Sequence, residues 1–125
     1  MEIEFIPYAE ALELKELGFN EPCFGGWAHP FKNNKNGFLQ LNQECEYDIK
    51  APTFSQAFRW FREEHSIYGI ILPSYSDNKA VKDRFFYEVV DSKKIKQELE
   101  YHTTHEEAEL VCLRKLIEII KEKQL

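Results

Sequence analysis

The sequence has few cysteines, and their spacing is not that of the common cysteine-based sites. The 125 residues include three cysteines, Cys23, Cys45 and Cys112, with no Cys-x-x-Cys pair. An odd number of widely separated cysteines is typical neither of a disulfide framework nor of a zinc site. We therefore expect free thiols in a reducing cytosol, with no metal and no cofactor. Cys112 lies on the apolar side of a predicted helix, where it would pack as a small hydrophobic residue.

Long apolar runs are also missing. The longest, residues 67–72, reads as a buried strand interrupted by Tyr68 and Gly69, and it is far shorter than the ~20 residues that a membrane span needs. The acidic residues 1–5 lack the basic region of a signal peptide. These features predict a cytoplasmic protein with no membrane association.

Basic residues are too few to indicate a nucleic-acid-binding protein. The sequence has 16 Lys and Arg residues and 22 Asp and Glu residues, for a net charge of −6. Proteins that bind nucleic acid by neutralising its phosphates usually have an excess of basic residues. Motifs for phosphate binding, dinucleotide binding, a nucleophilic serine or a zinc protease do not occur either. We therefore name no catalytic residue. A small enzyme stays open as an alternative, because catalytic side chains converge in space rather than in sequence.

The sequence is rich in apolar residues, at 43%, which suits one packed domain over residues 1–125. A first helix is predicted over residues 8–17, between Pro7 and Gly18, with Glu10, Glu13 and Glu16 on its solvent side. Asn36-Gly37 indicates a hairpin between apolar segments, followed by a polar connection over residues 42–50.

An aromatic helix follows, and it should plug the main core. Thr53 and Gln56 form a capping box, in which the glutamine side chain reaches back to the cap. One face of this helix carries Phe54, Ala57, Phe58, Phe61 and His65. We interpret His65 as a helix-end histidine, favourable near the C-terminal dipole, rather than as a general base.

Three further strands and a last helix complete the predicted fold. Strands are expected over residues 67–72, 84–90 and 95–101, although Lys, Gln and Glu over 93–100 would also suit a helix. Thr104 and Glu107 form a second capping box. The prediction is an α+β fold with an antiparallel sheet, made of an N-terminal hairpin and a three-stranded meander, backed by helices in the order α-β-β-α-β-β-β-α.

Two surfaces are candidate interaction sites. Basic and aromatic side chains alternate at Arg59, Trp60 and Arg62, as in surfaces that bind single-stranded nucleic acid. Trp60 lies to one side of the apolar stripe that faces the core, so we expect it to be exposed. In the last helix, one apolar stripe would face the sheet, and Leu110 and Ile117 belong to a second apolar stripe about half a turn away. This second stripe could form a homodimer, bind a partner, or be covered by another helix of the chain.

His102, His105 and Glu109 are candidate metal ligands, because imidazole and carboxylate groups at helical spacing can converge. His102 precedes the helix cap, so only His105 and Glu109 share a face, and two ligands make a weak site. A solvated helix entry is the better interpretation.

Three segments, residues 9–23, 51–63 and 104–120, together resemble an uncharacterised family of short proteins carried by phages and prophages. The resemblance spans nearly the whole chain and implies a small cytosolic accessory protein, with no activity and no catalytic residues to carry over. The sequence therefore predicts a non-enzymatic protein-interaction module with a protein partner of host or phage. The alternatives are a single-stranded nucleic-acid binder and a small enzyme.

Overall fold

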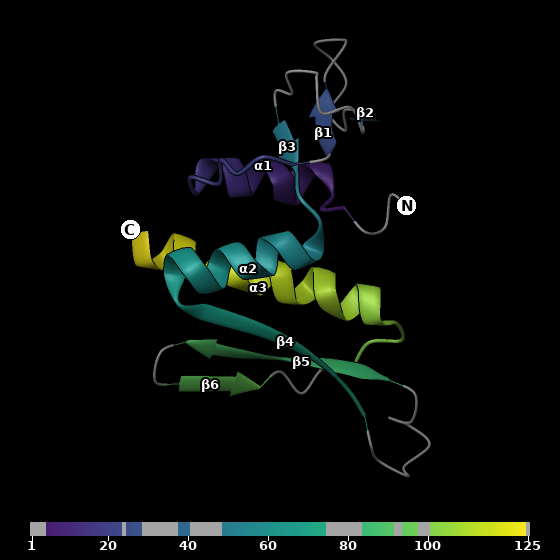
Figure 1. Cartoon of the computed structure of the whole chain (residues 1–125). Coiled ribbons are helices and arrows are strands. Elements are labelled where there is room, and N and C mark those ends of the chain that lie inside the picture. Colours follow the sequence, from purple (N-terminus) through teal and green to yellow (C-terminus); the bar gives the residue numbers. More distant parts are fainter. Residues whose placement is uncertain are drawn as a thin grey trace. The chain divides into compact units, whose positions relative to one another are not determined.

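The computed structural model of the chain contains helices and antiparallel strands. The described residues are 5–23, 25–28, 38–40, 49–74, 84–91, 94–97 and 101–124. These residues form the elements α1, β1, β2, β3, α2, β4, β5, β6 and α3 in chain order (Figure 1). This combination confirms the predicted α+β class.

The chain divides into two compact units, Met1–Ala57 and Phe58–Leu125, and the boundary falls inside α2. Each unit is described on its own below. One domain over residues 1–125 stays a prediction.

The first helix, α1, spans Tyr8–Glu16 and ends in a Schellman motif. Gly18 takes a φ of 103°, which a glycine adopts without a Cβ clash. Its N–H donates to the Lys15 carbonyl at 3.1 Å, and the Phe19 N–H donates to the Leu14 carbonyl at 3.0 Å. The Phe19 and Leu14 side chains are both buried. The helix therefore ends where the glycine predicted.

The acidic side of α1 differs from the prediction in one residue. Glu16 is exposed and Glu13 is half-buried, but Glu10 is buried. Glu10 precedes Leu14 by four residues and Leu17 by seven, a spacing that places all three on one helical face. That face packs into the core, and Glu10 is buried with it.

The N-terminal sheet contains a strand that the sequence did not predict. Its order is β2-β1-β3, with β1 at Gly25–Ala28, β2 at Phe38–Gln40 and β3 at Ile49–Ala51, and both pairings are antiparallel. β3 overlaps the end of the predicted polar connection, because its backbone pairs with β1, as in Gly26 opposite Lys50. The observed element order therefore has one more strand before α2 than predicted, and the Asn36-Gly37 turn lies outside the described residues.

Helix α2, Phe54–His65, begins at a threonine cap but lacks the reciprocal half of the capping box. The Gln56 N–H donates to Thr53 Oγ1 at 3.2 Å, as predicted. The Gln56 side chain instead donates from Nε2 to the Pro22 carbonyl at 2.9 Å, because this carbonyl lies within reach in the folded unit. Ser66, with a φ of 53°, follows the helix and leads the chain into β4.

The C-terminal unit contains a second antiparallel sheet. β4 spans Ile67–Pro73, β5 spans Phe85–Asp91 and β6 spans Lys94–Gln97, in the order β4-β5-β6. Beyond β6, His102 and Phe85 exchange backbone hydrogen bonds at 2.7 and 2.8 Å, so the chain returns to β5 before the last helix.

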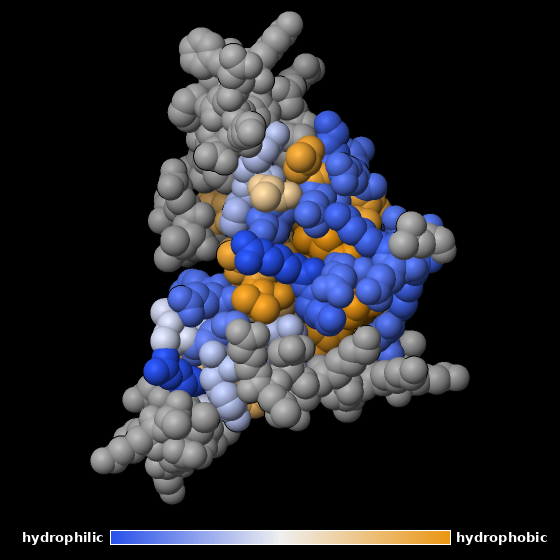
Figure 2. All heavy atoms as spheres, turned by 180° about the vertical axis from the view of Figure 1, so that it is seen from behind, coloured by the Kyte–Doolittle hydropathy of each residue, from blue (hydrophilic) through white to orange (hydrophobic). Residues whose placement is uncertain are grey.

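Helix α3, His105–Gln124, packs against β4 and β5 and covers one face of this sheet (Figure 1). Both of its apolar stripes are buried, except at Leu110, which is half-buried. Its buried residues are Ala108, Cys112, Leu113, Leu116, Ile117, Ile119 and Ile120. At its end, Lys123 Nζ lies 2.8 Å from Asp91 Oδ1 and joins the helix to the last residue of β5. Hydrophilic side chains cover much of the face drawn in Figure 2, with hydrophobic side chains in patches between them.

Strand β4 and helix α3 approach closely at Gly69. A Cβ at this position would lie 2.8 Å from Cys112 Sγ, closer than real Cβ atoms come, and 3.2 Å from Leu116 Cδ1, a tight contact. Close backbone approach is a recurring use of glycine inside strands. Cys112 is fully buried here, in agreement with its predicted role as a small hydrophobic residue.

Gly69→Ala should therefore lower the free energy of unfolding by about 1–3 kcal/mol through overpacking against α3. Urea denaturation of the two proteins measures the difference. Gly69→Ala should cost less stability in a Cys112→Ala background than in the parent, because the clashing sulfur is absent. The difference between Gly69→Ala/Cys112→Ala and Cys112→Ala measures this smaller cost. An unchanged midpoint in Gly69→Ala would contradict the close approach.

Candidate interaction surface

The face of the C-terminal sheet that α3 does not cover is largely apolar. On β4, Ile67 is buried, whereas the alternate residues Tyr68 and Ile70 are 46% and 40% exposed. On β5, Tyr87 and Val89 are buried on the α3 side. Because side chains alternate between the faces of a strand, one set packs under α3 and the other faces away from it.

We call this second set the outer sheet face. It consists of Tyr68, Ile70, Leu72, Phe86, Glu88, Val90 and Tyr101. The register places Tyr68 opposite Val90, Ile70 opposite Glu88, and Leu72 opposite Phe86.

Two aromatic residues of the outer sheet face, Phe86 and Tyr101, meet at one end of it. The Phe86 and Tyr101 rings meet edge to face, with centroids 5.8 Å apart, and Tyr101 is 43% exposed. Exposed tyrosine rings combine a large apolar area with a polar hydroxyl group, and tyrosine is enriched in protein-binding surfaces.

Sequence reasoning missed this surface because it read residues 67–72 as a buried strand. A continuous apolar run is the usual pattern of a strand that is covered on both faces. In the structure Ile67 is the one buried residue of β4, and Tyr68 and Ile70 are exposed. Tyr68 was a signal for the exposed side, since tyrosine suits a position that is partly in water.

The predicted surface on α2 keeps its arginines but not its aromatic residue. Arg59 and Arg62 are exposed, but Trp60 is only 5% exposed. Its ring packs edge-on against the rings of Phe61 and His65, with ring centroids 5.1 and 4.9 Å away. The expectation of an exposed Trp60 is therefore wrong, because the core beside α2 is wider than a single helical stripe.

The predicted surface on α3 is also largely covered. Leu110 is half-buried, and Ile117 is 1% exposed in a single chain. An interface through Ile117 would need a side chain that is already buried. The alternative, that the chain covers its own second stripe, agrees with this burial.

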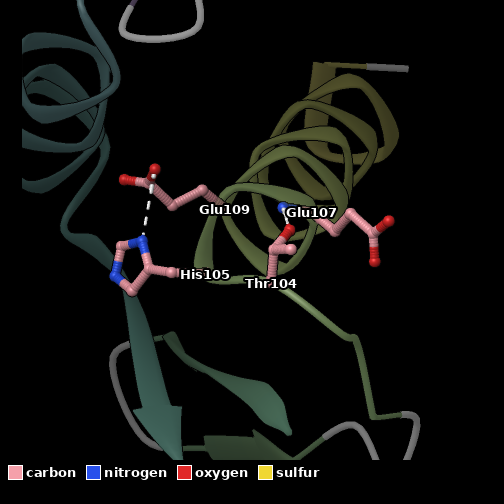
Figure 3. Close-up of polar contacts among 4 residues, drawn as sticks. All are labelled: Thr104, His105, Glu107 and Glu109. Carbon is pink, nitrogen blue, oxygen red and sulfur yellow. Dashed lines mark hydrogen bonds and ion pairs between the residues drawn. The ribbon is translucent and has the colours of Figure 1, made fainter.

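The polar residues at the start of α3 form a helix cap and one ion pair (Figure 3). The Glu107 N–H donates to Thr104 Oγ1 at 3.1 Å, as the capping box predicts. The Glu107 carboxylate, however, accepts from the Thr103 hydroxyl at 2.8 Å and the Thr103 N–H at 3.2 Å. These two hydrogen bonds lower the pKa of Glu107, because they favour its charged form.

His105 and Glu109 pair across one turn, with Nδ1 and Oε1 3.5 Å apart (Figure 3). Burial raises the pKa of Glu109, and the nearby His105 opposes that rise. His102 lies apart from this pair, in its bridge with Phe85, and its ring stacks on Tyr87 at 6.5 Å. Across the described ranges, no three His, Cys, Asp or Glu side chains are placed to hold one metal ion.

The described thiols are poor nucleophiles. Burial raises the pKa of Cys112 to about 12 and that of Cys23 to about 11. A thiolate is the reactive form, so neither sulfur is activated at neutral pH. Cys23 and Cys112 are free, and Cys45 lies outside the described residues.

Comparison with protein-family models, curated proteins and solved structures found no match to this chain. The resemblance to phage and prophage proteins therefore stays a prediction. Among the described helices, none has the length and apolar content to cross a membrane.

His65 lies at the end of α2, where a protonated histidine would be favoured by the helix dipole. Burial against the Trp60 and Phe61 rings nevertheless lowers its pKa below 6.5, with Lys123 adding to the shift and Glu64 opposing it. Desolvation thus outweighs the dipole that the sequence indicated. The folded protein favours the neutral imidazole.

This pKa shift predicts a loss of stability on acidification. Below pH 6.5 the unfolded chain binds the His65 proton more readily than the folded protein. The free energy of unfolding should therefore fall between pH 6.5 and the lower pKa of the folded protein, then level off. Urea denaturation of the parent and of His65→Gln measures this contribution as the difference between two pH curves. The curves should run parallel above pH 7, and parallel curves through the whole interval would contradict the shift.

Proposed function

We propose that this chain is a non-enzymatic protein-interaction module whose outer sheet face binds a protein of the host or of a phage. The observation that carries the proposal is the exposure of Tyr68 and Ile70 on a sheet face that α3 leaves uncovered. Monomeric proteins rarely expose contiguous apolar surface without a use for it. The cytoplasm is the compartment we propose, in line with the resemblance to phage and prophage accessory proteins.

The chemistry of the partner follows from the composition of the face. Tyr68, Phe86 and Tyr101 offer rings, and Ile70 offers an aliphatic centre. Glu88, opposite Ile70, is the charged residue of the outer sheet face. An apolar partner surface with a basic side chain near its middle would match this arrangement.

The two alternative functions have less support. A nucleic-acid surface on α2 would have to act through Arg59 and Arg62 without a stacking ring, because Trp60 is buried. A small enzyme with a cysteine nucleophile would need a thiolate, and burial favours the neutral form of both described thiols.

The test is capture of partner proteins from bacterial host lysate, followed by binding of the purified partner. Tyr68→Ser/Ile70→Ser should weaken binding at least ~10-fold, as expected for the loss of central apolar contacts. Arg59→Ser/Arg62→Ser is the matched control, with two exposed residues changed on α2, and it should bind like the parent. Circular dichroism and thermal melting establish that both variants are folded.

The same pair of variants separates the alternatives. Binding that is lost in the arginine variant and abolished by nuclease would favour the nucleic-acid function. Equal binding by the parent and by Tyr68→Ser/Ile70→Ser would contradict the outer sheet face as the site.

A further inference from the structure

β4 is an edge strand of the described sheet, and its sequence lacks the usual protection of edges. Its seven residues, Ile67–Pro73, include no charged side chain. Natural edge strands usually carry charges, bulges or prolines that prevent pairing with another chain. In β4 the proline is the last residue, so most of the strand is unprotected.

The residues of β4 that bond to β5 alternate with residues whose backbone groups point outward, and one hydrogen bond shows which residues are which. The Ser74 N–H donates to the Arg84 carbonyl at 2.9 Å, so the two residues form a hydrogen-bonded pair in the β4–β5 register. Such pairs alternate along an antiparallel ladder, so Ile70, opposite Glu88, also bonds toward β5. The N–H and C=O groups of Ile67, Gly69 and Ile71 therefore point away from β5. Ile67 is fully buried, whereas Gly69 and Ile71 are half-buried, so the accessible groups of this row are those of Gly69 and Ile71. An extended strand is the chemical partner that satisfies them.

A second copy of β4 fits this edge better than an arbitrary peptide, because the strand is complementary to itself. In an antiparallel pairing centred on Ile70, residues 68–72 are paired, and the buried Ile67 stays outside the pairing. Ile70 then lies opposite Ile70, Tyr68 opposite Leu72, and Gly69 opposite Ile71. Gly69 and Ile71, whose backbone groups point outward, thus face one another, and Pro73, which has no N–H, lies outside the pairing. No like charges meet anywhere in this register.

We infer that the chain forms a symmetric dimer in which the β4 strands of two copies pair antiparallel about a two-fold axis at Ile70. The two sheets then become one continuous sheet, and Tyr68, Ile70 and Leu72 of both copies adjoin on its outer side. This inference rests on the edge of the sheet, whereas the proposed function rests on its face. The dimer would present two outer sheet faces side by side to a partner.

Sedimentation velocity of the full chain at tens of micromolar tests the dimer. The parent should sediment as a dimer, and Ile70→Lys and Ile70→Glu should each be monomers, because like charges would meet at the two-fold axis. An equimolar mixture of these two variants should recover the dimer. Glu88→Lys is the matched control: it places a lysine on the same face but on the inner strand β5, and it should stay dimeric. A monomeric parent, or variants that remain dimers, would overturn the inference.

Cross-linking tests the register. Directly opposed residues of a non-hydrogen-bonded antiparallel pair have Cα atoms about 4.5 Å apart, within the range that a disulfide bridges. Ile70→Cys should therefore form a disulfide-linked dimer under mild oxidation. Tyr68→Cys should cross-link only when mixed with Leu72→Cys, and the parent measures the background from its native cysteines. Efficient self-cross-linking of Tyr68→Cys, with none in Ile70→Cys, would exclude the proposed pairing.

The two proposals can fail separately. A monomeric parent overturns the dimer but says nothing against the outer sheet face if Tyr68→Ser still reduces partner binding. A dimeric parent that captures no partner would instead support the edge and contradict the proposed function.

Discussion

The contact between α3 and β4 at Gly69 is the constraint on which the C-terminal unit depends. Because Gly69 has no side chain, Cys112 and Leu116 approach the strand backbone directly. The helix can then lie low over the sheet and bury Ile67 and Val89 beneath it. The ion pair between Lys123 and Asp91 joins the far end of the helix to the sheet. Because α3 is 20 residues long, this single helix packs against both β4 and β5.

Close packing on one face has a chemical consequence. Groups that could act as acids, bases or nucleophiles near α2 and α3 lose water, and burial shifts His65, Glu109 and Cys112 toward their neutral forms. The outer sheet face, in contrast, offers apolar and aromatic side chains to the solvent. The described part of the molecule therefore combines a core in which His65, Glu109 and Cys112 favour their neutral forms with a partly exposed apolar and aromatic sheet face.

Local signals in the sequence predicted the ends of helices well. The Schellman motif at Gly18 and the threonine caps at Thr53 and Thr104 each depend on residues within a few positions of one another. The longer side chains did not follow the same rule. Gln56 donates to Pro22 and Glu107 accepts from Thr103, because a flexible side chain takes whichever partner the fold brings near.

The sequence by itself determined the α+β class, the helix caps and the apolar face of α2. These features depend on short-range spacing, which the order of residues contains in full. Only the tertiary structure decided that Trp60 and Ile117 are buried, that β3 pairs with β1, and that one side of β4 is exposed. Each of these depends on how far a neighbouring element extends over a given face, and an apolar residue has the same letter in the sequence whether or not another element covers it.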